Sequence, residues 1–288
     1  RLVLVISLAV AVVTAAAHGM KVFVEDVEVY APGIEDWATF QSMVSAEHVP
    51  ALVGEHTKYK PASLPRNEQR RATRTTRLAF RVAEPLAGRC DVDLARAGSV
   101  FACSGGDYEV VDAICRLLAA DETMLSPTHF HNSVHNAPGG YWGIATASHV
   151  GSSSISAGDD TFVAGLLEAV VTCVTEKRST LFIAYDIAVP EPLRGKRPVA
   201  IDFGVAMMLH PALCARGWQC EITIDDAGSA EADHPYTALV GLNPIARSLP
   251  MLGHLALVRA GGVGVASTSG LVLPGRPPIR VEAQAVAV

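Results

Sequence analysis

Segments with the patterns of strands alternate with helical segments from Met20 to about Leu209, and this alternation limits the possible folds more than any other feature. Strand-like patterns occur at residues 20–30, 99–102, 152–157, 181–187 and 203–209. Between them, the apolar residues of 162–174 recur at i, i+4 spacing, as in a deeply packed helix. Strands that alternate with helices predict an α/β protein, with a mostly parallel sheet and helices on its faces.

Composition and charge limit the kinds of partner and the cellular compartment. The chain has 288 residues, half of them hydrophobic, and a formal net charge of −6. A negative charge argues against nucleic acid as a partner. The six cysteines include no CxxC pair, which in a chain of this size favours free thiols in a reducing compartment such as the cytoplasm over a disulfide framework.

Residues 1–19 are treated separately from residues 20–288, which we expect to form the working domain. The run from Leu2 to Ala17 is apolar except for Ser7 and Thr14, and Arg1 precedes it. This pattern is typical of a secretory signal and is shorter than a usual membrane span. The alternative is upstream translation before Met20, which reads like a fresh start, so a signal, an anchor and an upstream leader all remain open.

The most unusual chemistry lies in residues 126–146, SPTHFHNSVHNAPGGYWGIAT. We expect a loop that turns at Pro138-Gly139-Gly140 and enters a helix near Tyr141. His129, His131 and His135 form an H-x-H-x3-H pattern that could bind zinc or iron, with Asp159 or Asp160 adding a carboxylate. A metal-dependent hydrolase is therefore one alternative. Because no HExxH motif is present and asparagines lie between the histidines, we instead favour hydrogen bonds that hold the loop.

A strand, a small-residue turn and a helix follow in residues 152–169, which is where a nucleophile would be placed. A cysteine on such a turn faces the free N–H groups of the helix, which lower its pKa. Here the turn carries Asp159 and Asp160, and either suits an N-cap. Cys103, beside Ser104, is another candidate nucleophile. No base lies at a recognisable spacing from Cys103, so we interpret it as a small residue at a strand-to-loop junction.

Several runs resemble the β-ketoacyl synthases of the thiolase superfamily. The run SSSISAGDDTFVAGLLEA is similar to the segment around their active cysteine, and an ungapped overlay puts Asp159 at the nucleophile position. SPTHFHNSVHNAPGGYWGIAT, VFACSGGDYEVVDAICRLL and LFIAYDIAVPEPLRGKRP resemble the chain-length-factor-like branch found with aryl polyene and type II polyketide gene sets. The resemblance covers residues 20–209 well and the last eighty residues only loosely.

This resemblance implies a thiolase-like layered α/β/α fold with one full half and a shortened second half. It also implies a non-catalytic subunit that pairs with an active β-ketoacyl synthase, because Asp159 replaces the cysteine and the half that carries two catalytic histidines is missing. A homodimer and a weakly active synthase using another residue remain alternatives. No cofactor or resident metal is expected. By the same resemblance, an interface beside the acyl pocket is expected to contain Phe130, His131, Asn132, His135, Asn136, Tyr141 and Trp142.

A run of arginines precedes a helical segment that extends through Ala83. The members that could dock an acidic partner, which the resemblance identifies as an acyl carrier protein, are Arg70, Arg71, Arg74 and Arg77. The alternative interpretation is a solvated helix face.

Overall fold

The computed structural model describes residues 19–47, 59–121, 124–224, 237–260, 271–273, 275 and 278–286. The apolar leader, residues 1–18, lies outside the described residues. In the described part of the chain, no helix is long and apolar enough to cross a membrane.

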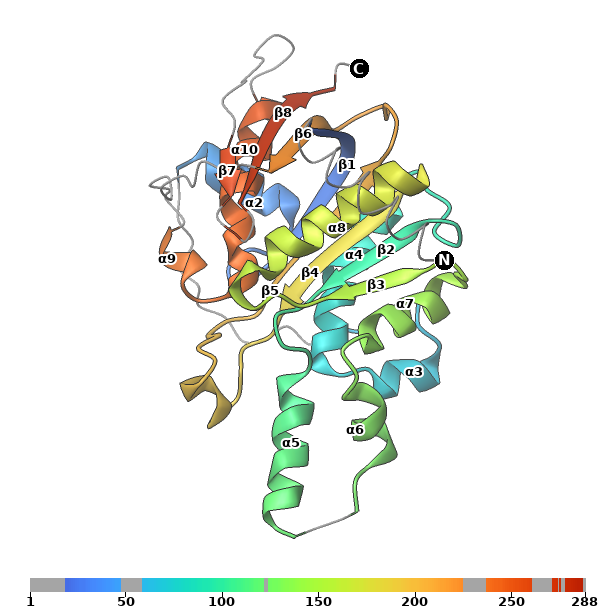
Figure 1. Ribbon diagram of the computed structural model, residues 1–288, viewed down its shortest axis with the longest axis vertical. Helices are drawn as coiled ribbons and strands as arrows, with labels where there is room; N and C mark the ends of the chain where they lie inside the picture. The colour runs from blue at the N-terminus through green and yellow to red at the C-terminus, as the bar shows by residue number, and fades with distance from the viewer. Residues whose placement is uncertain are drawn as a thin grey trace, which may run out of the picture.

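One mixed sheet forms the centre of the molecule (Figure 1). Its strands are β1 (Met20–Tyr30), β2 (Gly98–Ala102), β3 (Ser152–Ile155), β4 (Thr180–Asp186), β5 (Phe203–His210), β6 (Trp218–Ile224), β7 (Leu271–Leu273) and β8 (Ile279–Ala285). They lie in the order β3-β2-β4-β5-β1-β6-β8-β7. The first five positions come from residues 20–210, and the three C-terminal strands extend the sheet beyond β1.

Helices cover both faces of this sheet. The α-helices are α2 (Trp37–Ser45), α3 (Arg66–Arg71), α4 (Arg74–Arg89), α5 (Tyr108–Ala119), α6 (Pro127–Asn132), α7 (Ala137–Thr146), α8 (Thr161–Glu176), α9 (Thr237–Val240) and α10 (Leu249–Ala260). Helices α2, α8 and α10 share one hydrophobic cluster with one face of the sheet, and α4 and α7 share a second cluster with the other face. The three-layer α/β/α arrangement is therefore confirmed.

The expectation of a mostly parallel sheet is wrong. Among the described strands, only the pairs β2–β3 and β2–β4 are parallel. Strands β5 and β1 run antiparallel to their neighbours. A parallel crossover usually contains an α-helix. Residues 187–202 between β4 and β5 contain only the 3-10 turn η2 (Leu193–Gly195), and β5 pairs antiparallel with β4.

Other elements follow the sequence patterns to different degrees. Residues 218–224 alternate apolar and polar side chains, as in a hairpin arm, and form β6, which pairs antiparallel with β1 and β8. Residues 34–53 have a loosely helical pattern, and the structure describes them as far as residue 47; α2 begins after Asp36, whose side chain accepts a hydrogen bond from the Thr39 N–H. The sequence also favours a strand near residues 262–266, which lie outside the described residues; the described strand nearby is β7.

Helix α8 packs closely on the sheet, as its apolar spacing predicts. Phe162 and Phe182 have ring centroids 5.7 Å apart. Gly165 faces β2 and β4 so closely that an added Cβ would lie 2.5 Å from the Cβ of Ala102. The absent side chain therefore sets the separation between α8 and the sheet, and with it the position of the turn that precedes α8.

Helices α5 and α6 form an arm that projects from the sheet (Figure 1). The apolar residues of α5 recur along one stripe, and this stripe is only partly packed. Val110 is buried, but Val111 is 37% exposed and Leu118 is 67% exposed. The connected segment adds Met124 and Phe130, which are also exposed. The arm thus carries apolar surface that the described part of the chain does not cover.

Candidate functional site

The turn between β3 and α8 lies where the sequence predicts a nucleophile position. It is the 3-10 turn η1 (Gly158–Asp160), which Gly158 opens with φ of +58°. The side chain of Thr161 closes the turn: its Oγ1 accepts from the Ala157 N–H at 3.0 Å and donates to the Gly158 carbonyl at 2.7 Å. Asp160 occupies the expected N-cap position of α8, but its side chain makes no cap hydrogen bond there.

Both aspartates of this turn instead form ion pairs with distant arginines. The carboxylate of Asp159 accepts a hydrogen bond from the guanidinium of Arg197 and is 56% exposed. Asp160 lies 3.3 Å from Arg247, measured from Oδ1 to Nη1. Burial lowers the pKa of Arg197, but the hydrogen bond and charge of Asp159 outweigh burial and raise it. The predicted nucleophile position thus holds a carboxylate that is already paired with a cation.

A buried polar cluster lies at the ends of β2 and β4, beside this turn. The thiol of Cys103 donates to Oδ1 of Asp186 at 3.1 Å, and the Ser104 N–H donates to the same oxygen at 2.9 Å. Burial raises the pKa of the Cys103 thiol, and the charge of Asp186 raises it further. A thiolate is the reactive form of cysteine, so Cys103 is a poor nucleophile at neutral pH.

The Asp186 carboxyl is itself perturbed. Burial raises its pKa, while the hydrogen bonds from Ser104 and Cys103 lower it, and burial prevails. Its second oxygen and the Ser104 hydroxyl are buried without a hydrogen-bond partner among the described residues. No sequence pattern connects Asp186 to Cys103, which lies 83 positions earlier.

The three histidines of the candidate metal motif have separate surroundings. His129 and His131 lie on α6, where the His131 ring packs edge-on against Tyr141 at 5.7 Å. His135 lies in the turn after α6, and its Nε2 contacts the backbone oxygen of Cys103 at 3.0 Å. Among the described residues, no group of three or more His, Cys, Asp or Glu side chains is arranged to hold a metal ion.

Part of the segment predicted as a loop is helical. Pro138 lies in the first turn of α7, where a proline is well tolerated, so the Pro-Gly-Gly run begins a helix instead of forming a turn. Gly139 allows close packing: its Cβ would lie 3.1 Å from the Ser152 hydroxyl. Asn132 is buried and donates to the backbone oxygens of Arg71 and Thr128.

The two aromatic residues of this segment face the core. Tyr141 is 1% exposed and Trp142 is 4% exposed, and Trp142 packs edge-on against Phe80 at 5.4 Å. The expectation that they anchor a partner is therefore wrong, because both side chains are already packed within the chain. The exposed apolar residues nearby are Phe130 on α6 and Ile144 on α7, at 66% and 53%.

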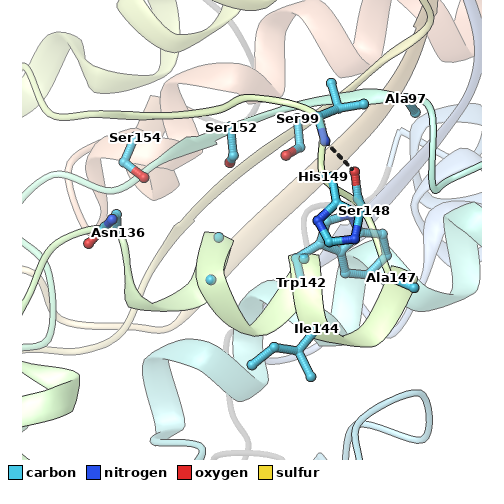
Figure 2. Close-up of a pocket in the computed structure, with 14 residues that line it drawn as sticks. Ala97, Ser99, Asn136, Trp142, Ile144, Ala147, Ser148, His149, Ser152 and Ser154 are labelled. Atoms are coloured by element: carbon cyan, nitrogen blue, oxygen red, sulfur yellow. Dashed lines mark hydrogen bonds between the residues drawn. The ribbon is translucent and has the colours of Figure 1, made fainter.

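A groove of about 610 Å³ lies between α7 and the edge strand β3. Figure 2 shows Ser152 and Ser154 of β3 and Ser99 of β2 along one side, with α7 opposite them. Asn136 lies toward one end, and Ser148, whose hydroxyl accepts from the Val150 N–H, toward the other. Small polar side chains and glycines line most of this groove, so backbone atoms are accessible there.

The arginines of the basic run divide into two groups. Arg74 donates to Asp202 and Glu109, and Arg77 donates to the Ala72 carbonyl at 3.0 Å, so both are used within the fold. The side chains of Arg70 and Arg71 are exposed and donate to Asn67 and Glu68 of their own helix. Of these four arginines, the second pair is the more exposed.

The class of protein follows from sequence comparison with known families. The profile of the β-ketoacyl synthase N-terminal domain matches residues 41–255. The chain therefore belongs to the β-ketoacyl synthase N-terminal domain family. No curated protein sequence matches the chain.

Solved structures share the fold. A chain from a ketosynthase in complex with its chain length factor, from Xenorhabdus doucetiae, superposes with a TM-score of 0.65 at 22% identity, covering 91% of this chain and 99% of that one. A chain of the ishigamide ketosynthase/chain length factor gives a TM-score of 0.65 at 14% identity, covering 93% and 99%. A chain from a structure of a type II polyketide synthase acyl-carrier protein in complex with its ketosynthase gives a TM-score of 0.52 at 17% identity, covering 67% of this chain and 63% of that one.

Proposed function

We propose that the chain is a non-catalytic, chain-length-factor-like subunit that pairs with an active β-ketoacyl synthase in polyene, polyketide or fatty acid-type chain elongation. The observation that carries the proposal is Asp159, a paired carboxylate on the turn where family members hold the nucleophile. Two solved chains from ketosynthase/chain length factor structures also have about the same length as this one, since the superpositions cover 91% and 93% of this chain and 99% of each of the others. The proposal places the chain in the cytoplasm, consistent with free cysteines.

The chemistry of the Asp159 turn supports the proposal that the chain does not itself condense acyl thioesters. Attack by a carboxylate on a thioester would form an anhydride, which water hydrolyses, and Asp159 is further held by Arg197. Intact-mass spectrometry after incubation with an acyl carrier thioester should therefore show no acylated chain. The alternative of a weakly active synthase predicts a stable adduct. An acyl group on any of the six cysteines would support that alternative over the non-catalytic proposal.

Edge strand β3 and the adjoining α7 groove form the proposed pairing surface. β3 is an outer strand of the sheet, and edge strands present unpaired backbone N–H and C=O groups that another strand can use. Ile144 lines the groove and its side chain is exposed. Phe130, on α6 of the projecting arm, is exposed as well. Apolar surface of this kind commonly marks an interface.

Matched glutamate substitutions test this surface. Ile144→Glu puts a charge on the groove wall, and loss of one buried isoleucine contact alone costs about 1.5–3 kcal/mol, or roughly tenfold or more in affinity. Leu257→Glu on α10 is the control, because Leu257 has similar exposure, 57% against 53%, on the opposite face of the sheet. Affinity for a co-expressed active ketosynthase would be measured by calorimetry. Equal affinity of both variants would place the interface elsewhere.

Acyl carrier protein docking is proposed at Arg70 and Arg71, the exposed members of the basic run. An acidic partner would gain long-range attraction there that weakens with salt. Arg70→Glu should weaken carrier binding by about threefold to tenfold at low salt, since rim charges contribute modestly. Lys196→Glu, which reverses an exposed cation elsewhere, is the control. If both variants bind the carrier equally well, this helix is only a solvated face.

A further inference from the structure

A serine, a histidine and a glutamate form a continuous hydrogen-bonded chain at the other end of α8 from the Asp159 turn. Ser179 Oγ lies 3.0 Å from Nδ1 of His210, and Nε2 of the same ring lies 2.7 Å from Oε2 of Glu25. Helix α8 has 16 residues, so these three hydrogen-bonded side chains lie about 24 Å along the helix from Asp159. It is therefore separate from the nucleophile turn.

The fold fixes each member of this set. Ser179 follows the left-handed C-cap Lys177 and immediately precedes β4, and its carbonyl accepts from the Gly98 N–H at 2.9 Å. His210 is the last residue of β5. Glu25 is the extra residue where the β1–β5 register shifts between Val24 and Asp26, and such bulges re-aim side chains beside functional sites.

The tautomer of His210 follows from its partners. A carboxylate only accepts hydrogen bonds, so Nε2 must carry the proton that faces Glu25. In the neutral ring the lone pair is then on Nδ1, which faces the Ser179 hydroxyl. The Glu25 carboxylate is held in turn by Arg216 at 3.5 Å and by the Asp91 N–H at 3.3 Å. The imidazole is thus oriented as a base toward the serine, with the two ring nitrogens exchanged relative to the common triad.

These residues border open space. Ser179 and His210 line a pocket of about 580 Å³, whose other walls carry charged side chains including Arg96, Lys177, Asp91 and Glu176. The side chains of His210 and Glu25 are 15% and 10% exposed, so the hydrogen bonds are partly shielded from water while the serine faces the pocket. A charged lining favours a short or polar acyl group over a long alkyl chain.

We propose that Ser179, His210 and Glu25 form a second, hydrolytic site that acts on short acyl esters or thioesters. Ser179 Oγ attacks the acyl carbon while His210 Nδ1 takes the hydroxyl proton, and Arg96 donates to the developing oxyanion. The alcohol or thiol leaves with that proton, which gives an acyl-Ser179 ester. Water then attacks this ester with His210 again as base, releasing the acid and restoring the serine. This activity goes beyond the proposed pairing function and does not depend on it.

Hydrolysis and covalent labelling test the site in the full-length chain. Hydrolysis would be measured with two substrates, the ester p-nitrophenyl acetate and the thioester S-acetyl-N-acetylcysteamine, which shows whether the site acts on esters, thioesters or both. Ser179→Ala and His210→Gln should each lower the rate by about 10²-fold or more toward background. Glu25→Gln should lower it by at least tenfold, because the amide no longer fixes the tautomer. Hydrolysis of either substrate with these losses supports the proposal.

Ser63→Ala is the matched control, because Ser63 Oγ donates to the Glu84 carboxylate without an intervening histidine. It should retain the wild-type rate. A fluorophosphonate should add to Ser179, located by peptide mass spectrometry, and a purely structural hydrogen bond would not produce this adduct. Circular dichroism confirms folding of each variant. Unlabelled Ser179, or wild-type hydrolysis that is unchanged in Ser179→Ala, would overturn the proposal.

Discussion

The close approach of α8 to the sheet predicts an unusual outcome for Gly165→Ala. In an exposed helix this change adds about 1 kcal/mol of stability, because alanine is the better helix former. At Gly165 the new Cβ would lie 2.5 Å from Ala102 Cβ and 2.9 Å from Phe182 Cε2, and atoms at these distances must move apart. Overpacking of a dense core costs about 1–3 kcal/mol. Because both new contacts lie below 3.0 Å, the overpacking cost should lie in the upper part of this range, about 2–3 kcal/mol. Subtracting the helix gain of about 1 kcal/mol leaves a net loss of roughly 1–2 kcal/mol.

Urea unfolding followed by circular dichroism measures this difference. With a slope of about 2 kcal/mol per molar urea, the midpoint should fall by roughly 0.5–1 M. Gly88→Ala on α4 is the control, since nothing lies within 4 Å of its Cβ position, and its midpoint should stay or rise. A Gly165→Ala protein as stable as the wild type would refute the close approach, and with it the explanation of how α8 positions the Asp159 turn.

Three further predictions concern Trp142, Asp186 and Asp159. Trp142→Ala should lower the free energy of unfolding by about 3–5 kcal/mol in urea titrations, because Trp142 packs against Phe80 in the core; a loss below 1 kcal/mol would show that the ring is not packed. Asp186→Asn should be more stable than the wild type at pH 7 by on the order of 1 kcal/mol, because it removes a buried charge. Burial raises the folded-state pKa of Asp186 above the ordinary value of 3.8, so its stabilising contribution is full at low pH and is lost as pH rises through the raised pKa. The stability difference between the two proteins should therefore grow over that window, and a pH-independent difference would contradict this. Asp159→Cys should react with iodoacetamide faster than the exposed Cys115, because the start of α8 favours a thiolate, whereas equal rates would argue against a nucleophile-like position.

The sequence predicted the elements better than their directions. The i, i+4 spacing from Phe162 predicted a buried helix, and the structure confirms it. Strand direction depends on which connections between strands contain α-helices. The connection between β4 and β5 contains none, and the apolar sequence of β5 itself does not reveal this. Pro138 followed by two glycines is equally compatible with a turn and with a helix start. Packing of Gly139 against β3 selects the helix, and that contact is not visible in the local sequence.

The candidate site was predictable in position and only partly in its contacts. A strand-turn-helix pattern sufficed to place Asp159, because the relevant residues are consecutive. Its partner Arg197 is 38 positions away and lies in a loop whose path depends on the antiparallel return to β5. The same limit applies to Glu25 and His210, which are 185 positions apart and are joined only by the pairing of β1 with β5. Local patterns identify turns, whereas the sheet order decides which side chains meet.

The start of α8 shows how a turn that is predicted to hold a nucleophile can hold carboxylates instead. The first N–H groups of a helix favour an anion, whether it is a thiolate or a carboxylate. The carboxylate of Asp159 binds Arg197, and that of Asp160 binds Arg247. Both arginines come from segments after β4, so these ion pairs tie the turn to the C-terminal part of the chain. A residue type that removes the nucleophile thus also supplies contacts that hold the turn in place.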